Sequence, residues 1–250
     1  MENELVLNDP TENPEKSNRN QLGWGKFLLF FLTYLAVQVV VIAIAMIITV
    51  ISSDFNDIEL LIEDFLTSQW LLYLDFLGFL ITIFIFKSAR QFLRKAFSFA
   101  PLKKGRTYLY LIGAFIFMYI TQYIILDVLQ WEDATEQVEI FGFDKLSLGW
   151  VSIIIILFGM AVITPIKEEF LFRGILHGFL SEKWGFWLGL ILSSVIFGLL
   201  HPGYAISASI MGAVFVGLYR LTRSLIVPIL LHIVWNAFAV VGLIMYVSGL

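Results

Sequence analysis

The sequence predicts an all-α membrane protein, a polytopic bundle of about seven to eight transmembrane helices. Hydrophobic residues make up 59% of the 250 positions and charged residues only 14%, whereas a soluble domain has about 45–50% and about 25%. Apolar runs long enough to cross a bilayer recur along the chain. Because these runs are continuous rather than alternating, and because lipid offers backbone groups no partners, they are predicted to be helices rather than barrel strands.

The composition also excludes several classes of function. The net charge is −4 and no basic tail is present, so nucleic acid is not an expected partner. The chain has no cysteine, which excludes disulfides and thiolate catalysis and leaves only His and carboxylate ligands for a metal. The polar residues 1–26 have the composition of a disordered tail. They lack the features of a cleavable signal peptide, so the first apolar run is expected to be an uncleaved anchor.

The apolar runs give seven candidate spans, each near the ~20 residues that a bilayer requires. They cover residues 27–52, 70–86, 108–126, 148–164, 184–200, 204–221 and 225–247. A further apolar helix is expected at about 167–180, continuing the fourth span past a break at Pro165.

The connections between spans alternate in charge. Residues 53–69 hold five acids and no base, residues 87–107 seven bases and no acid, and residues 127–147 six acids and one base. Basic loops stay in the cytoplasm, so the N-terminus and the 87–107 segment are predicted inside and the two acidic loops outside. With aromatic residues among its bases, the 87–107 segment is suited to lie partly along the inner membrane surface.

The segment ITPIKEEFLFRGILHG, residues 163–178, places three ionisable side chains inside this apolar chain. Each costs about 2.5–3.5 kcal/mol at the centre of a spanning helix. Glu169 and Arg173 lie four residues apart, on one helical face, and can form an ion pair. Glu168 is rotated by about 100° from Glu169, which leaves its carboxylate free for chemistry.

Two further motifs add polar groups to later spans. FGLLH places Phe197 and His201 four residues apart, and HIVWN does the same for His232 and Asn236. A free carboxylate with two histidines is suited to activate water as a general base, and a His–Asn pair can donate hydrogen bonds to an oxyanion. Zinc held by the carboxylate and both histidines is the alternative, although no HExxH motif is present.

Each motif alone also has a structural interpretation. The Glu169–Arg173 pair could lie at an interface, His201 at the end of a span, and His232 with Asn236 in hydrogen bonds between helices. His177 is assigned to the surroundings of the site, and Asp75 has no partner nearby in the sequence.

Together, EEFLFR, FGLLH and HIVWN resemble, in order and placement, the EExxxR, FxxxH and HxxxN motifs of the CPBP (Abi) family of intramembrane proteases. This family includes the type 2 CAAX prenyl endopeptidases and bacteriocin-immunity proteins. The resemblance covers about residues 149–247. It divides the chain into a cytoplasmic tail (1–26), N-terminal transmembrane helices (27–147) and a catalytic core (148–250).

The resemblance implies a role for each motif residue. Glu168 would activate water, with Glu169 and Arg173 as its supporting pair. His201 would help to hold the water, and His232 with Asn236 would form the oxyanion hole. No cofactor would be required; a zinc ion, if present, would be bound by Glu168, His201 and His232. The cavity of the prenyl endopeptidases implies an opening to the cytoplasm.

These expectations describe a multi-pass protease of a bacterial cell membrane that acts on a membrane-bound peptide or protein. A non-catalytic scaffold or immunity protein of the same fold is the alternative, and a proton-coupled transporter a third. The sequence leaves the substrate and the oligomeric state open. The predicted topology also separates Glu168 from His201, unless Pro165 or the Pro202-Gly203 pair breaks a helix.

Overall fold

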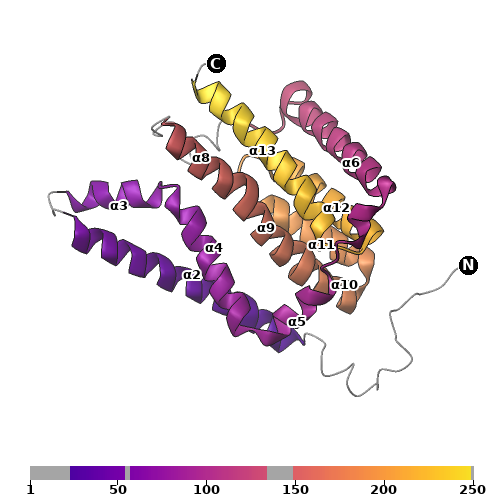
Figure 1. The fold of residues 1–250 in the computed structure, drawn as a ribbon, viewed down its shortest axis with the longest axis horizontal. Coiled ribbons are helices and arrows are strands. Elements are labelled where there is room, and N and C mark those ends of the chain that lie inside the picture. Colours follow the sequence, from indigo (N-terminus) through magenta and orange to yellow (C-terminus); the bar gives the residue numbers. More distant parts are fainter. Residues whose placement is uncertain (1–22, 54–56, 134–148, 249–250) are drawn as a thin grey trace, which may run out of the picture.

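The computed structural model describes residues 23–53, 57–133 and 149–248. These residues form helices and connecting turns with no strand among them, which confirms the all-α prediction. Figure 1 shows the helices side by side in an elongated bundle. The tail predicted for residues 1–26 lies almost wholly outside the described residues.

The N-terminal part is a helical hairpin with a bent second arm. Helix α2 (Trp24–Ser52) begins three residues before its predicted span. Helices α3 (Ile58–Leu66) and α4 (Trp70–Ile85) follow, bent by 66° at a short break. Asp57 caps α3 by accepting the Leu60 N–H at 3.1 Å, which satisfies one of the unpaired donors of a helix start.

The basic segment is helical and connects α4 with the next span. It contains α5 (Lys87–Lys95) and the 3-10 turn η1 (Ala100–Lys103). Helix α6 (Gly105–Tyr123) then runs along α12 (Ala205–Thr222) and α13 (Ile226–Ser248) and ends in the π-helical turn η2 (Ile124–Val128).

One continuous helix of 35 residues replaces two predicted elements. It comprises α8 (Trp150–Phe158), η4 (Gly159–Ile163), α9 (Thr164–Glu168), η5 (Glu169–His177) and α10 (Gly178–Trp184). The predicted break at Pro165 was therefore wrong. A proline ring clashes with the carbonyl four residues earlier in an α-helix, but here the wider π-helical turn η4 comes directly before it.

The remaining helices are α11 (Phe186–Leu199), α12 (Ala205–Thr222) and α13 (Ile226–Ser248). Helix α11 has only 14 residues, so it is about 21 Å long and too short to span the bilayer. It turns back into α12 through residues 200–204, where Gly203 has a positive φ of 76°. The break predicted at Pro202-Gly203 is thus confirmed.

These features lower the number of spans. Among the described residues, five helices are long and apolar enough to cross a membrane, or six if the bent pair α3–α4 counts as one span. The polytopic membrane fold is confirmed. Five or six of the predicted seven to eight spans qualify among the described residues, because two predicted elements merge into one helix and α11 is short.

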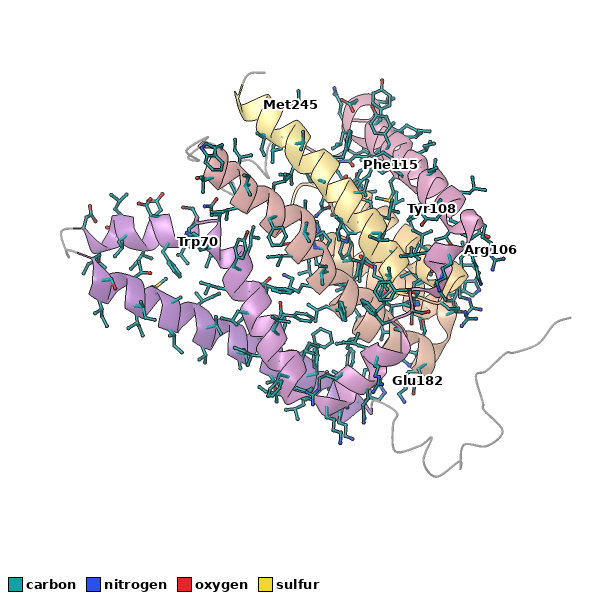
Figure 2. The ribbon with its side chains drawn as sticks, viewed as in Figure 1. Trp70, Arg106, Tyr108, Phe115, Glu182 and Met245 are labelled. Carbon is teal, nitrogen blue, oxygen red and sulfur yellow. The ribbon has the colours of Figure 1, made fainter. Side chains whose placement is uncertain are left out.

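The bundle has one basic end, formed by the 87–107 segment, and one acidic end, where α3 with Asp57, Glu59 and Asp64 and the end of α6 with Asp127 and Glu132 lie. At the basic end, the Leu225 N–H donates to the Ala96 carbonyl at 2.9 Å, and Ser224 Oγ donates to the Ser98 carbonyl at 2.6 Å. These bonds hold the start of α13 against the basic segment. In Figure 2, Arg106 and Glu182 lie toward this end.

At the acidic end, the start of α4, the start of α8 and the far end of α13 meet. The Tyr73 hydroxyl donates to the Ile155 carbonyl at 2.7 Å, and Ile156 packs in a cluster with Val240 and Ile244. Figure 1 shows α3, α8 and the C-terminal end of α13 on this side, opposite α5 and α10.

Candidate active site

Glu168, His201 and His232 come together inside the bundle from three different helices or helix ends. An oxygen of Glu168, Oε2, lies 3.7 Å from Nε2 of His232 and 4.0 Å from Nε2 of His201. The separation that the predicted topology implied between Glu168 and His201 is therefore absent. The short α11 places His201 within the bundle, and the continuous long helix carries Glu168 to the same depth.

Glu169 is held on the buried side of the same helix. Its Oε1 atom lies 2.9 Å from Nη1 of Arg173 and 2.9 Å from Nδ1 of His232. Its side chain is 0% exposed and that of Arg173 1%. The ion pair predicted from the i,i+4 spacing is therefore present, and His232 is a second partner of the same carboxylate.

The guanidinium of Arg173 lies between aromatic rings. Its central carbon is 4.2 Å from the ring centroid of Phe197 and 4.8 Å from that of Phe215. Neither terminal nitrogen makes a well-aligned hydrogen bond to a described residue, so the Glu169 contact is an ion pair of imperfect geometry. Attraction to the ring faces, about 2 kcal/mol or more for a desolvated cation, helps to keep this charge buried.

The Phe-x-x-x-His spacing is explained by the end of α11. The last carbonyls of a helix lack an intrahelical partner, and the His201 N–H bonds to Gly198 rather than to Phe197. The Phe197 carbonyl instead accepts from Nδ1 of His201 at 2.7 Å. The motif thus orients the imidazole through the backbone of its own first residue.

The two histidines present the same ring atom to Glu168. An oxygen acceptor faces Nδ1 in each, the Phe197 carbonyl for His201 and the Glu169 carboxylate for His232. These partners assign the Nδ1 proton, which leaves Nε2 as the lone-pair atom of each neutral ring. Within the described residues, Glu168 Oε2 has no hydrogen-bond partner. Three acceptors therefore point at one small volume.

The helix that carries these glutamates is π-helical just past Glu168. Residues Glu169–His177 form η5, and π-helical turns are rare and frequent at functional sites. Two π-helical segments, η4 and η5, therefore flank the single α-helical turn α9 that ends at Glu168.

Asn236 lies on α13 one turn beyond His232. Its Nδ2 atom donates to the Met160 carbonyl in η4 at 3.0 Å. A side-chain amide has two N–H donors, so one remains for another acceptor. Both Asn236 and Met160 line the cavity next to Glu168.

The cavity has a volume of about 180 Å³. Its polar lining residues are Gln122, Thr164, Glu168, His201, Tyr204, His232 and Asn236, and its apolar ones are Leu72, Met160, Phe197, Ala208, Met211, Trp235, Ala239, Val240 and Leu243. Apolar walls with a few convergent polar groups are typical of a ligand site. The predicted residues Glu168, His201, His232 and Asn236 all line it, while Glu169 and Arg173 lie behind them.

Glu168, His201 and His232 are of the types that bind zinc, but their spacing is wide. A tetrahedral zinc with bonds of about 2.0–2.1 Å places two ligand atoms about 3.3–3.4 Å apart, compared with 3.7 and 4.0 Å here. Among the described residues, no group of three or more His, Asp or Glu side chains has the arrangement of a metal site.

Several residues near the site were missed in the sequence. Thr164 precedes Glu168 by four residues, a spacing that signals a shared face. Tyr204 follows the Pro202-Gly203 turn; burial, and secondarily the charges of Glu132 and Asp133, raise the pKa of Tyr204 to about 12. Its hydroxyl is therefore protonated at neutral pH. No sequence pattern singles out Phe215, which stacks on His232 with ring centroids 4.6 Å apart.

Two residues on which the sequence was undecided lie outside the cavity. Asp75 on α4 pairs with Lys167 and accepts a hydrogen bond from the Tyr34 hydroxyl at 2.8 Å. His177 is buried, with a ring nitrogen 3.2 Å from Ser181 Oγ. Asp75 ties α4 to α2 and to the long helix, whereas the His177 contact lies within the long helix, and neither residue lines the cavity.

Comparison with known proteins points to the same part of the chain. Residues 150–238 match the family model described as type II CAAX prenyl endopeptidase Rce1-like. A Bacillus subtilis (strain 168) protein named "Putative membrane peptidase YdiL" is 39% identical over 83 residues, 32% of this chain. The matched stretch spans about a third, 34%, of that relative. No solved structure matches.

The matched residues contain every side chain predicted for the site, from Glu168 to Asn236. The apolar helices agree with a membrane location. The resemblance stated from three short motifs is thus supported by an independent comparison: residues 150–238 are similar to the Rce1-like, type II CAAX prenyl endopeptidase family.

Proposed function

We propose that this protein is an intramembrane endopeptidase that hydrolyses a peptide bond in a membrane-associated protein or peptide, with water activated by Glu168. The observation that carries the proposal is the convergence of Glu168 Oε2 with the Nε2 atoms of His201 and His232, at 3.7 and 4.0 Å. These separations are too long for direct hydrogen bonds and suit a bridging water molecule.

The chemistry follows from the acceptors that surround this water. The Glu168 carboxylate removes a proton from water, and the oxygen attacks the carbonyl carbon of the peptide bond. The carbon–nitrogen bond of the tetrahedral intermediate then breaks. Glu168 returns the proton to the departing amine, so the carboxylate is regenerated and one water is consumed for each bond cleaved.

The buried pair behind the site supports this role for Glu168. Glu169 is neutralised by Arg173 at 2.9 Å and also accepts from Nδ1 of His232. This contact fixes the orientation of His232, with Nε2 toward Glu168. The second N–H of Asn236, on the same helix one turn beyond, would donate to the oxyanion of the intermediate.

The proposal requires no cofactor. If zinc is bound, Glu168, His201 and His232 are the residues that would hold it, and its chemistry would be to lower the pKa of a bound water. The Nδ1 contacts of both histidines also resemble those that orient zinc ligands. The test therefore includes a chelator.

The orientation that accompanies the proposal is a multi-pass protein of the cell membrane with a cytoplasmic N-terminus. It rests on the positive-inside rule, applied to the basic residues at one end of the bundle. These include Lys87, Arg90, Arg94, Lys103, Lys104, Arg106, Arg220 and Arg223.

The experiment is cleavage of a library of membrane-anchored peptides by the purified protein in detergent. Wild type is compared with Glu168→Gln, with and without chelator, and with Glu59→Gln as the matched control. Glu59 is an exposed glutamate in the first turn of α3, far along the chain from the site. We expect cleavage by wild type and Glu59→Gln, with or without chelator, and none by Glu168→Gln.

Other results would change the assignment. Activity lost with chelator and restored by zinc would move the mechanism to the metal. Full activity in Glu168→Gln would remove Glu168 from the reaction. A biological phenotype retained in Glu168→Gln would favour the non-catalytic scaffold or immunity protein.

A further inference from the structure

Among the residues that the structure describes, the cavity extends from Glu168 toward one end of the bundle. On the long helix it is lined by Met160, Thr164 and Glu168 and by no residue beyond Glu168. On α13 the lining begins at His232 and runs on to Leu243. Both series lead from the carboxylate toward the start of α8 and the end of α13, which lie at the acidic end.

The other helices place the far wall of the cavity at the same end. Leu72 is the third residue of α4, and Gln122 is the last but one of α6. Tyr204 precedes α12, whose first backbone N–H groups, at Ile206 and Ser207, donate to the carboxylate of Glu132. Ala239, another lining residue, is exposed, so the cavity reaches the surface of the bundle.

The path from Glu168 to the basic end is filled with side chains. Glu169 and Arg173 occupy the next turns of the helix, with Phe197 and Phe215 against the guanidinium. All four are at most 1% exposed. Beyond them a buried apolar cluster continues through Ile175 to Leu225 at the start of α13. A peptide could not reach Glu168 from this side without displacing that core.

We propose that the peptide bond reaches Glu168 from the acidic end, which the positive-inside rule places on the outer face of the membrane. The substrate is then an extended segment at or near the outer membrane surface, with apolar side chains next to the cleaved bond to match the apolar walls. This inference rests on the proposed function for the identity of the reacting carboxylate. It reverses the cytoplasmic opening that the family resemblance implied.

Single cysteines test the direction of access, because the natural chain has none. Leu243→Cys places a thiol in the cavity wall, and Val241→Cys, 45% exposed on the same helix, is its lipid-facing control. Asp127→Cys and Lys103→Cys mark the acidic and basic ends at exposed positions. A membrane-impermeant maleimide is applied to right-side-out and to inside-out vesicles containing the full-length protein.

We expect Leu243→Cys and Asp127→Cys to be labelled in right-side-out vesicles and Lys103→Cys in inside-out vesicles. Leu243→Cys should react at least about tenfold faster than Val241→Cys, because a thiol in apolar surroundings stays protonated and unreactive. Labelling of Leu243→Cys only from the inside, or from neither side, would overturn the proposal. Labelling of Lys103→Cys from the outside would overturn it as well.

The result is independent of proteolysis. The same labelling in a Glu168→Gln background needs no substrate and no activity, and we expect an unchanged pattern there. A chain that shows outer access but cleaves nothing would leave the direction of access supported while the proposed function fails. A chain that cleaves peptides but shows only inner access would support the proposed function and overturn the direction of access.

Discussion

The Nδ1 atom of His232 lies 2.9 Å from Oε1 of Glu169, the carboxylate that also pairs with Arg173. This contact separates the functions of two adjacent glutamates. Glu169 is fully buried and bound on the core side of the helix. Glu168, 14% exposed, faces the cavity and both Nε2 atoms. One peptide bond therefore separates a carboxylate that stabilises the bundle from one that is available to react.

The first prediction concerns the opposite effects of the same substitution at these two positions. Glu169→Gln removes the charge that neutralises buried Arg173, and breaking such a pair costs about 3–5 kcal/mol. Glu168→Gln removes an unpaired, largely buried carboxylate, so stability should be unchanged or higher, because a neutral amide costs less in the membrane than a charge. Unfolding of the detergent-solubilised protein, followed by circular dichroism, measures both.

Activity should separate the two variants in a different way. Glu168→Gln should be folded and inactive, whereas any loss in Glu169→Gln should accompany its loss of stability. Equal stability of the two variants would show that Arg173 does not depend on Glu169 for its burial.

The second prediction concerns Gly198, where α11 and α12 come into closest contact. A Cβ atom here would collide with Ser209 Oγ and the Ala205 carbonyl and would lie 2.9 Å from the Ser209 nitrogen. Because two of these atoms belong to the backbone, Gly198→Ala must push α12 away, next to the turn that holds His201. Overpacking of this kind costs about 1–3 kcal/mol, and we expect both stability and cleavage rate to fall.

Gly217→Ala is the matched control, because nothing lies within 4 Å of a Cβ atom at that position of α12. Replacing an open helical glycine with alanine should stabilise the protein by about 0.5–1 kcal/mol. Thermal unfolding and peptide cleavage are compared for both variants. Equal behaviour of the two alanines would contradict the close contact of α11 with α12.

The sequence predicted the fold class and the pairing of Glu169 with Arg173 because both depend on local rules. Continuous apolar runs predict helices in lipid, and a spacing of four residues places two side chains on one helical face. Ser194 and Gly198 are small residues four positions apart, a spacing that lets helices approach closely, and a Cβ atom on Gly212 of α12 would lie 3.1 Å from Ser194 Cα. That Glu168, His201, His232 and Asn236 carry catalysis stays a prediction.

The relations that the sequence did not predict are non-local or depend on helix type. Proline normally marks a helix break, and no residue pattern showed that π-helical turns would carry the chain through Pro165. The contacts of Glu169 with His232 and of Asp75 with Lys167 join residues 63 and 92 positions apart. Only the packing of α4 and α13 against the long helix determines which partner each side chain meets.

The third prediction uses this Asp75–Lys167 pair. The Lys167 side chain is 14% exposed, so Asp75→Asn leaves an ammonium group inside the membrane region without its counter-charge. On insertion scales such a charge costs about 2.5–3.5 kcal/mol, and we expect Asp75→Asn to lose most of that stability. The double variant Asp75→Asn with Lys167→Met should recover it, because an apolar side chain of similar length replaces the charge. Thermal unfolding of the three proteins measures the recovery, and a double variant no more stable than Asp75→Asn would contradict this explanation.

The fourth prediction separates the two amides that line the cavity. Asn236 keeps one N–H for an oxyanion while the other bonds to the Met160 carbonyl, so Asn236→Ala should lower kcat by about 10²–10³ with little change in KM, as for the loss of an oxyanion donor. Gln122 lines the same cavity from α6, near the acidic end rather than beside His232. Gln122→Ala should therefore act mainly on KM.

Steady-state cleavage of one peptide substrate by Asn236→Ala and by Gln122→Ala gives kcat and KM for each. Equal losses of kcat would mean that these amides contribute only to the shape of the cavity. A rise in KM with unchanged kcat in Asn236→Ala would mean that Asn236 does not stabilise the transition state.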